Sequence, residues 1–130
     1  MTPPRELYLV RHGIAAERAE GGDQARPLTA DGVSRLRAEA AGLAALEVDW
    51  DLILTSPLVR ARQTAEVLAE VMKNATTVVT SALAPLATPE DTLSEIGRHA
   101  EHTRLALVGH EPNMGEVAAR LLAQIGRAHV

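Results

Sequence analysis

Three short polar clusters contain the residue types that can bind and transfer a phosphoryl group. They are Arg11-His12-Gly13, Ser56-Pro57 with Arg60, and Gly109-His110-Glu111. The planar guanidinium of arginine holds phosphate oxygens through paired hydrogen bonds and keeps its charge at any working pH. A neutral imidazole nitrogen is a competent nucleophile near pH 7. These side chains would suit phosphoryl transfer if the fold brought them together.

Each residue type has an expected role in such a site. We expect His12 to attack phosphorus and form a phosphohistidine, while Arg11 and Arg60 hold the phosphoryl oxygens. His110 would stabilise the same oxygens by hydrogen bonding. A helix beginning at Ser56-Pro57 would add backbone donors and the positive end of a helix dipole. Ser56 also has a purely structural interpretation as a helix cap, and both roles are compatible.

Hydrophobic patterns predict the elements that would position these clusters. Apolar runs of strand length occur at 7–10, 52–54, 76–79 and 105–108. Between them, apolar residues recur at steps of three and four through 33–46 and 61–72, which is typical of helices. Strands that alternate with helices predict a mainly parallel sheet with helices on both faces. The three polar clusters directly follow three of these strands, and ligands bind at the carboxyl ends of parallel strands.

The starts of the helices are marked by capping residues. Thr29 is expected to cap one helix, and Ser56-Pro57 and Thr88-Pro89 each combine a capping hydroxyl with a proline at the first helical position. Asn113, with Glu116 three residues later, predicts a fourth helix start.

Composition limits the classes of protein that fit this chain. Its 130 residues predict a single domain, 1–130. A net charge of -4 and an aromatic content of 2% disfavour nucleic acid as a partner. The absence of cysteine excludes a disulfide framework, a thiolate metal site and a cysteine nucleophile.

No membrane partner, metal or cofactor is expected. The chain lacks an apolar run of the ~20 residues that span a bilayer and lacks the regions of a signal peptide, so we expect a cytoplasmic protein. No Asp/His cluster has metal-ligand spacing, and the glycine-rich lysine loop of nucleotide hydrolases is absent. His99 and His102 fit no motif and are expected to face solvent from a polar helix or loop.

Taken in order along the chain, the motifs resemble those of the histidine phosphatase superfamily, which has the phosphoglycerate mutase-like fold. The resemblance covers nearly the whole chain and implies a three-layer α/β/α sandwich with a mainly parallel central sheet. It also implies His12 as the phosphorylated nucleophile, with Arg11, Arg60 and His110 around the phosphate. The matching stretches are Leu9-Val10-Arg11-His12-Gly13, Arg26-Pro27-Leu28-Thr29 with Gly32, Thr55-Ser56-Pro57 leading to Arg60-Ala61-Arg62-Gln63-Thr64-Ala65, and Val108-Gly109-His110-Glu111-Pro112-Asn113.

Within the superfamily, the short length and the Gly-His-Glu-Pro-Asn stretch resemble the SixA-type phosphohistidine phosphatases. Mutases and many phosphomonoesterases of the superfamily carry a glutamate proton donor after the third strand, whereas 83–86 reads Leu-Ala-Pro-Leu here. An imidazole leaves more readily than an alkoxide and can dispense with a strong acid. A phosphorylated protein, such as a phosphotransfer domain, is therefore the favoured substrate. The same resemblance places Arg26 and Asp23 near the phosphate, with Arg26 extending the clamp and Asp23 orienting it or contacting the substrate.

Two other functions stay open. A small-molecule phosphomonoesterase or mutase of the same superfamily would act on a phosphate ester and need a carboxylate as proton donor. A phosphate-binding regulatory domain without turnover would keep the pocket and lack the reaction. Glu90 and Asp91 are expected to be first-turn residues of a helix rather than the proton donor.

The end of the chain differs from the SixA pattern. SixA-type chains continue past the helix after His110 into another strand or hairpin, whereas only 126–130 follow the expected helix here. We therefore expect the sheet to lack a strand, through either a shortened fold or a truncated chain. An exposed sheet edge favours pairing with another copy, so a homodimer is one expectation.

Overall fold

A computed structural model describes residues 6–129 of the chain. Strands and helices alternate along it, with two short 3-10 turns between them. The elements are β1 (Glu6–Arg11), η1 (Asp23–Ala25), α1 (Ala30–Ala45), β2 (Leu52–Thr55), α2 (Val59–Ala69), β3 (Thr76–Val79), η2 (Ser81–Leu83), α3 (Pro89–Gly97), β4 (Arg104–Gly109) and α4 (Asn113–His129).

The strands form one parallel sheet in the order β1-β4-β2-β3. Leu7 of β1 pairs with Leu105 of β4, and Leu52 of β2 pairs with Leu105 on one side and with Thr76 of β3 on the other. All four predicted strands are confirmed, each to within one residue at either end. The sheet therefore aligns the ends of β1, β2 and β4, from which the polar clusters continue.

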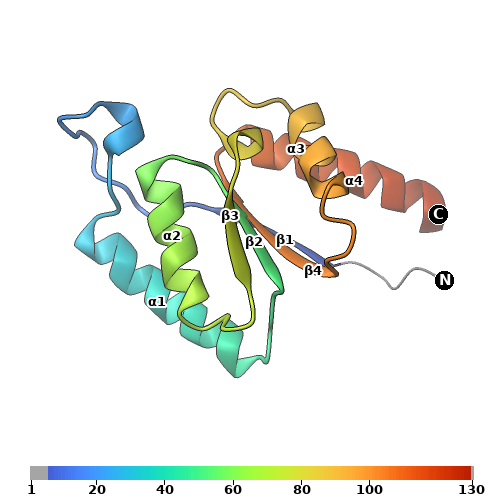
Figure 1. The fold of residues 1–130 in the computed structure, drawn as a ribbon, viewed down its shortest axis with the longest axis horizontal. Coiled ribbons are helices and arrows are strands. Elements are labelled where there is room, and N and C mark those ends of the chain that lie inside the picture. The colour runs from blue at the N-terminus through green and yellow to red at the C-terminus, as the bar shows by residue number, and fades with distance from the viewer. Residues whose placement is uncertain (1–5, 130) are drawn as a thin grey trace.

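Helices cover both faces of the sheet, as Figure 1 shows, with α1 and α2 on one side and α3 and α4 on the other. Successive strand residues point to opposite faces. Ile53 and Val108 pack with α1 and α2, whereas Leu54 and Leu107 pack in a second cluster with Ile96 of α3. The predicted α/β/α sandwich is confirmed, and its sheet residues are buried on both sides.

Two of the predicted helix caps are present. The Thr29 hydroxyl accepts a hydrogen bond from the Gly32 N–H at 2.9 Å at the start of α1. Thr88 and Asp91 form a reciprocal capping box at the start of α3, with the Thr88 oxygen accepting from the Asp91 N–H. Glu90 and Asp91 are first-turn residues, as predicted.

The prediction that α2 begins at Ser56-Pro57 is wrong. The backbone remains extended at Leu58, and the helix begins at Val59 without a side-chain cap. Ser56 instead accepts a hydrogen bond from the Leu58 N–H at 3.2 Å, which closes a short turn between β2 and α2. Asn113 is the first residue of α4 and directs its amide to Thr92 Oγ1.

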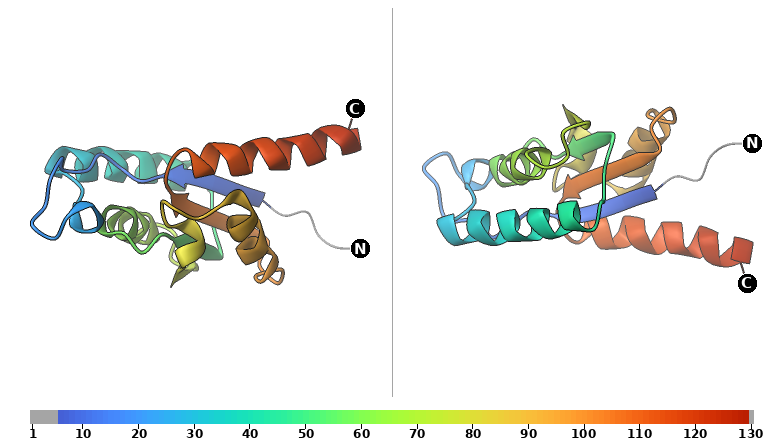
Figure 2. Two further views of the ribbon diagram at one scale, coloured as in Figure 1. Left: turned by 90° about the horizontal axis from the view of Figure 1, so that it is seen from above. Right: turned by 90° about the horizontal axis from the view of Figure 1, so that it is seen from below.

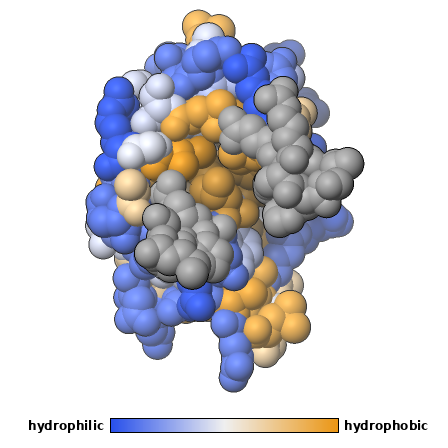
Figure 3. Space-filling view, turned by 90° about the vertical axis from the view of Figure 1, so that its right-hand side faces the viewer, coloured by the Kyte–Doolittle hydropathy of each residue, from blue (hydrophilic) through white to orange (hydrophobic). Residues whose placement is uncertain are grey.

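The last helix projects beyond the sheet. Figure 2 shows α4 running past the amino end of β1. Leu122 of α4 is 65% exposed, and Figure 3 shows hydrophobic side chains gathered in a hollow at this end of the molecule. No strand follows α4 within 6–129, and β1 pairs only with β4. No helix within this range is long and apolar enough to cross a membrane.

Candidate active site

The carboxyl end of the sheet brings the predicted phosphate-binding residues to one cavity of about 1050 Å³. Arg11, His12, Arg60 and His110 all line it. His12 directly follows β1, His110 directly follows β4, and Arg60 lies in the first turn of α2. The two imidazole rings lie with their centroids 5.1 Å apart. Residues from three distant parts of the sequence therefore share one pocket.

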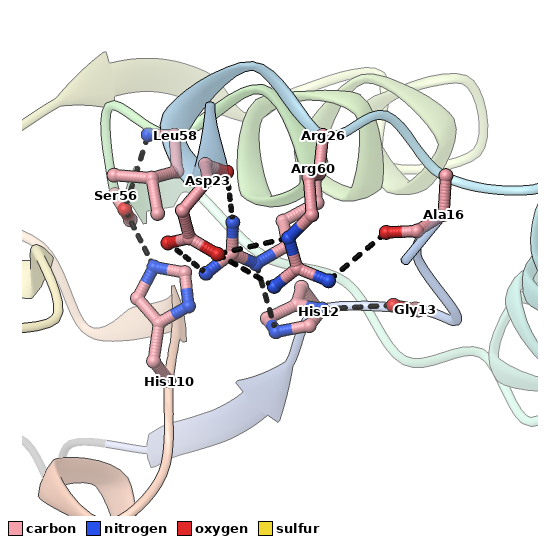
Figure 4. Close-up of polar contacts among 9 residues, drawn as sticks. All are labelled: His12, Gly13, Ala16, Asp23, Arg26, Ser56, Leu58, Arg60 and His110. Atoms are coloured by element: carbon pink, nitrogen blue, oxygen red, sulfur yellow. Dashed lines mark hydrogen bonds and ion pairs between the residues drawn. The ribbon is translucent and has the colours of Figure 1, made fainter. Parts of the chain in front are cut away.

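His12 is held with one ring nitrogen fixed and the other directed at Arg60 (Figure 4). Its Nδ1 lies 2.8 Å from the Gly13 carbonyl oxygen, which can only accept, so Nδ1 carries the ring hydrogen. Nε2 accepts from Arg60 Nε at 3.3 Å and therefore presents its lone pair. Partial burial, together with the charges of Arg60, Arg26 and Arg11, lowers the pKa of His12 although the Gly13 bond opposes the shift.

Arg60 is the buried cation of the site, with 5% of its surface exposed. Beside its bond to His12, it donates from Nη1 to the Asp23 carbonyl oxygen at 2.8 Å and from Nη2 to the Asp23 carboxylate at 3.3 Å. Arg11 lies at the exposed edge of the same cavity. The Arg60 guanidinium is thus fixed inside the pocket, whereas Arg11 is an exposed residue of its lining.

Asp23 and Arg26 reach the site from the loop between β1 and α1. Arg26 donates from Nε to Asp23 Oδ1 at 2.8 Å and from Nη1 to the Ala16 carbonyl at 2.9 Å. The hydrogen bond from Arg26, followed by the charge of Arg60, lowers the pKa of Asp23. Both residues line a smaller adjoining cavity of about 350 Å³ rather than the main one. The Asp23 carboxylate therefore joins two guanidiniums at the edge of the pocket.

His110 is buried and has one engaged ring nitrogen. Its Nε2 lies 2.7 Å from Ser56 Oγ. Its Nδ1 is buried and has no hydrogen-bond partner among the described residues. Burial, reinforced by the nearby His12 and Arg60, lowers the pKa of His110 to about 4, so the ring is neutral at pH 7.

The structure adds two residues of α2 to which sequence reasoning gave no role. Thr64 Oγ1 accepts from the Gly13 N–H at 3.0 Å and donates to the Arg60 carbonyl at 2.8 Å. Gln63 Oε1 accepts from the Leu28 N–H at 2.7 Å. Residues at both ends of the loop between β1 and α1, Gly13 and Leu28, therefore hydrogen-bond to α2. The only sequence signal for these bonds is that both residues lie within the helix motif that begins at Arg60.

Two acidic residues, Glu39 and Glu111, line the cavity. Pro85, from the stretch with no acidic residue, lines it, whereas Leu86 is almost fully exposed. Glu111 also lines the cavity, directly after His110. Its carboxylate lies over Gly115, where a Cβ would approach Glu111 Oε2 to 3.0 Å. Glu111 is thus an acidic group near the pocket that the sequence left without a role.

The expectation that His99 and His102 simply face solvent is wrong. His102 Nδ1 lies 3.1 Å from the Asp51 carboxylate, and His99 Nε2 lies 3.3 Å from the Glu95 carboxylate. One polar atom each of His99, Glu101 and His102 lies within 4.8 Å of the other two. This group surrounds the amino ends of β2 and β4, at the opposite end of the sheet from the candidate active site.

The motif order and the fold identify the class of protein. A family model of the histidine phosphatase superfamily (branch 1) matches residues 7–88. The chain therefore belongs to the histidine phosphatase superfamily, and it is a phosphatase.

Its structural relatives place it among the SixA-type members. A structure from Agrobacterium tumefaciens, assigned as the phosphohistidine phosphatase SixA, has a TM-score of 0.81 and 34% identity, over 95% of this chain and 79% of that one. The protein histidine phosphatase SixA complexed with tungstate has a TM-score of 0.80 and 27% identity, over 87% of this chain and 74% of that one. An uncharacterized protein of Picosynechococcus is 46% identical over 118 residues, which is 87% of this chain and 70% of that protein.

Proposed function

We propose that this chain hydrolyses phosphohistidine on a protein, through a phosphohistidine of its own at His12. The observation that carries the proposal is the single cavity in which His12, Arg60 and His110 converge, with both imidazoles neutral at pH 7. A neutral imidazole with a directed lone pair is a nucleophile, and the guanidinium beside it is suited to phosphoryl oxygens.

The reaction has two steps. First, the hydrogen bond from Arg60 Nε to His12 Nε2 gives way as Arg60 turns to the phosphoryl oxygens. The freed lone pair of Nε2 attacks phosphorus, a P–N bond forms, and the bond from phosphorus to the substrate imidazole breaks. The leaving imidazole keeps the electron pair and takes a proton from water. Water then attacks phosphorus, the bond to Nε2 breaks with its electron pair returning to the ring, and a proton of the attacking water neutralises the hydroxide left by the first step. Inorganic phosphate leaves, and His12 regains its neutral form. Arg60, Arg11 and the His110 ring stabilise the charge on the phosphoryl oxygens in both steps.

Three observations support phosphohistidine as the substrate. Residues 83–86 supply no carboxylate to protonate an alkoxide leaving group, and Pro85 of this stretch lines the cavity. An imidazole leaving group has less need of such an acid. Two similar solved structures are named as SixA phosphatases, and the one with tungstate shows that a relative binds a tetrahedral oxyanion. Arg26, beside Asp23 at the edge of the pocket, would extend the cationic surface toward the phosphoprotein.

One observation favours a second candidate, a small-molecule phosphomonoesterase. Glu111 lines the cavity next to His110 and could protonate an alkoxide leaving group after a rotation away from Gly115. In that case Glu111→Gln would abolish hydrolysis of phosphate esters. For a phosphohistidine substrate, the same variant retains most of its activity.

The test is to trap the phosphorylated enzyme. The purified chain is mixed with a phosphotransfer protein carrying radiolabelled phosphohistidine, quenched during turnover, and separated from the substrate. We expect acid-labile, base-stable label on the chain, and none on His12→Ala. His99→Gln, which removes an imidazole at the other end of the sheet, serves as the matched control and keeps the label.

The outcomes separate the candidate functions. Label on His12→Ala would rule out the proposed nucleophile. Faster turnover of a panel of phosphate esters than of the phosphoprotein, with loss on Glu111→Gln, would favour the phosphomonoesterase. Phosphate binding without release of phosphate from any substrate would point to a regulatory domain.

A further inference from the structure

We propose that Ser56 is a positioning residue that fixes the tautomer of His110, so that His110 presents an N–H, not a lone pair, to the transferring phosphoryl group. The expected effect of Ser56 on catalysis rests on the proposed function. The tautomer of His110, with the hydrogen on Nδ1 and the lone pair on Nε2, can be measured without any reaction.

The hydrogen bonds of Ser56 determine the direction of its hydroxyl. Ser56 Oγ accepts from the Leu58 N–H at 3.2 Å and lies 2.7 Å from His110 Nε2. Ser56 is fully buried, and its hydroxyl has no other partner within the described residues. If His110 Nε2 carried a hydrogen, it would donate to Ser56, and the Ser56 hydrogen would be left buried without an acceptor. That tautomer would also leave the buried Nδ1 lone pair unpaired, so two buried polar groups would lack a partner, whereas a hydrogen on Nδ1 leaves only the Nδ1 N–H unpaired. Because buried polar groups are rarely left unpaired, the Ser56 hydroxyl donates and Nε2 accepts.

The remaining ring nitrogen of His110 follows from this arrangement. A neutral imidazole carries a single hydrogen, so it lies on Nδ1. The ring is neutral at pH 7 because burial lowers the pKa of His110 to about 4. Nδ1 is buried and unpartnered among residues 6–129, and Figure 4 shows it on the side of the ring that faces His12. The unsatisfied donor therefore points to the place where a phosphoryl group on His12 would lie.

The opposite tautomer would change the electrostatics of the pocket. With the hydrogen on Nε2, the Nδ1 lone pair would face the phosphoryl oxygens and repel them. The repulsion would be largest in the transition state, in which negative charge gathers on those oxygens. Loss of the Ser56 hydroxyl should therefore lower kcat more than it changes KM. A residue that served only to close the turn before α2 would not alter the tautomer.

Solution NMR of the chain with ¹⁵N-labelled histidine tests the assignment directly. Protonated and unprotonated imidazole nitrogens have well-separated ¹⁵N shifts, and the assignment to His110 comes from the His110→Asn spectrum. We expect a protonated Nδ1 and an unprotonated Nε2 in the wild-type chain at pH 7. Ser56→Ala should give a mixture of tautomers, and Ser56→Thr, which keeps a hydroxyl, should restore the wild-type pattern.

Turnover measurements give the second readout. Ser56→Ala should lower kcat on a phosphohistidine protein by roughly tenfold to a hundredfold with KM changed less than threefold, and Ser56→Thr should recover most of it. A wild-type His110 with its hydrogen on Nε2 would overturn the inference without any variant, even for an active enzyme. An unchanged tautomer in a folded Ser56→Ala chain would also overturn it. A wild-type chain with the expected tautomer and no phosphatase activity would refute the proposed function and leave the hydrogen-bond assignment intact.

Discussion

Two neutral imidazoles lie beside a fixed cation in the candidate site, and no carboxylate hydrogen-bonds to either ring among the residues described. In many enzymes a carboxylate orients a catalytic histidine and raises its basicity. Here the orienting groups are neutral: a backbone carbonyl for His12 and a hydroxyl for His110. Partial burial, together with the neighbouring guanidiniums, lowers the pKa of His12. This arrangement keeps both rings neutral and leaves the positive charge on arginine, which can bind an anion.

Asp23 is the acidic residue in contact with this cationic set. Its carboxylate bonds to both Arg26 and Arg60, so an incoming anion must compete with it. We predict that Asp23→Asn, which keeps an oxygen acceptor and removes the charge, strengthens inhibition by tungstate or phosphate by about two- to fivefold. The modest size follows from the exposure of the carboxylate. Inhibition constants measured at fixed ionic strength give the result.

Asp49→Asn removes the same charge from a partly exposed position away from the pocket and controls for net charge. An equal effect of the two variants would mean that Asp23 acts only through the net charge of the protein. Weaker inhibition in Asp23→Asn would mean that the carboxylate mainly orients Arg26.

At the scale of the elements, the strands could be predicted because each is an apolar run bounded by polar residues. The helices α1 and α3 could also be located because Thr29 and Thr88 carry recognisable caps. The start of α2 was misplaced because a Ser-Pro pair serves equally well in a turn, and the hydroxyl of Ser56 bonds within the turn and to His110. That second bond joins residues 54 positions apart, which no local pattern encodes.

The junction between the β1–α1 loop and the start of α1 depends on a glycine. A Cβ on Gly32 would approach the Ile14 carbonyl oxygen to 2.4 Å, which is too close for any side chain. We predict that Gly32→Ala destabilises the chain by about 1–3 kcal/mol, since the loop that carries Asp23 and Arg26 must move. Urea unfolding measures the change, and turnover should fall with it.

Gly42 provides the matched control in the same helix. Nothing lies within 4 Å of a Cβ at this position, so Gly42→Ala should stabilise the chain by up to about 1 kcal/mol through the better helix propensity of alanine. If both variants had the same effect, the close approach of Ile14 to α1 would not be important for stability.

At the scale of the whole molecule, the sequence predicted the layers and the parallel sheet, and the order of the strands came from the structure. Alternation of strands and helices specifies crossovers without specifying which strands become neighbours. The pairing of β1 with β4 joins the first and the last strand, and it is this pairing that brings His12 next to His110. The grouping of site residues could be expected from their positions after strands, but the direction of each ring could not.

The neutral state of His110 links the global stability of the chain to pH. Its pKa is about 4 in the folded chain and near 6.5 when unfolded, so between these values the unfolded chain binds more protons. We predict that the free energy of unfolding falls as the pH is lowered from about 6.5 to 4, by at most on the order of 3 kcal/mol from this residue. His12, whose pKa is also lowered, adds to the same trend.

Chemical unfolding at several pH values, compared with His110→Asn, isolates this contribution. The variant should lose part of the pH dependence between pH 6.5 and 4 and differ least in slope above pH 7. Parallel stability curves for the two proteins over the whole range would show that His110 has the same pKa in the folded and the unfolded chain.

The pairing of β1 with β4 also has a consequence for how the chain is made. A ribosome releases β1 first, but the strand that lies beside it emerges only after Arg104. Until then the apolar residues of β1 have no neighbour in the sheet, and closing so long a loop is entropically costly. The anion pocket forms only when the first and the last strand of the chain pair with each other. Phosphate therefore cannot stabilise the nascent chain through this pocket before β4 has emerged and paired with β1.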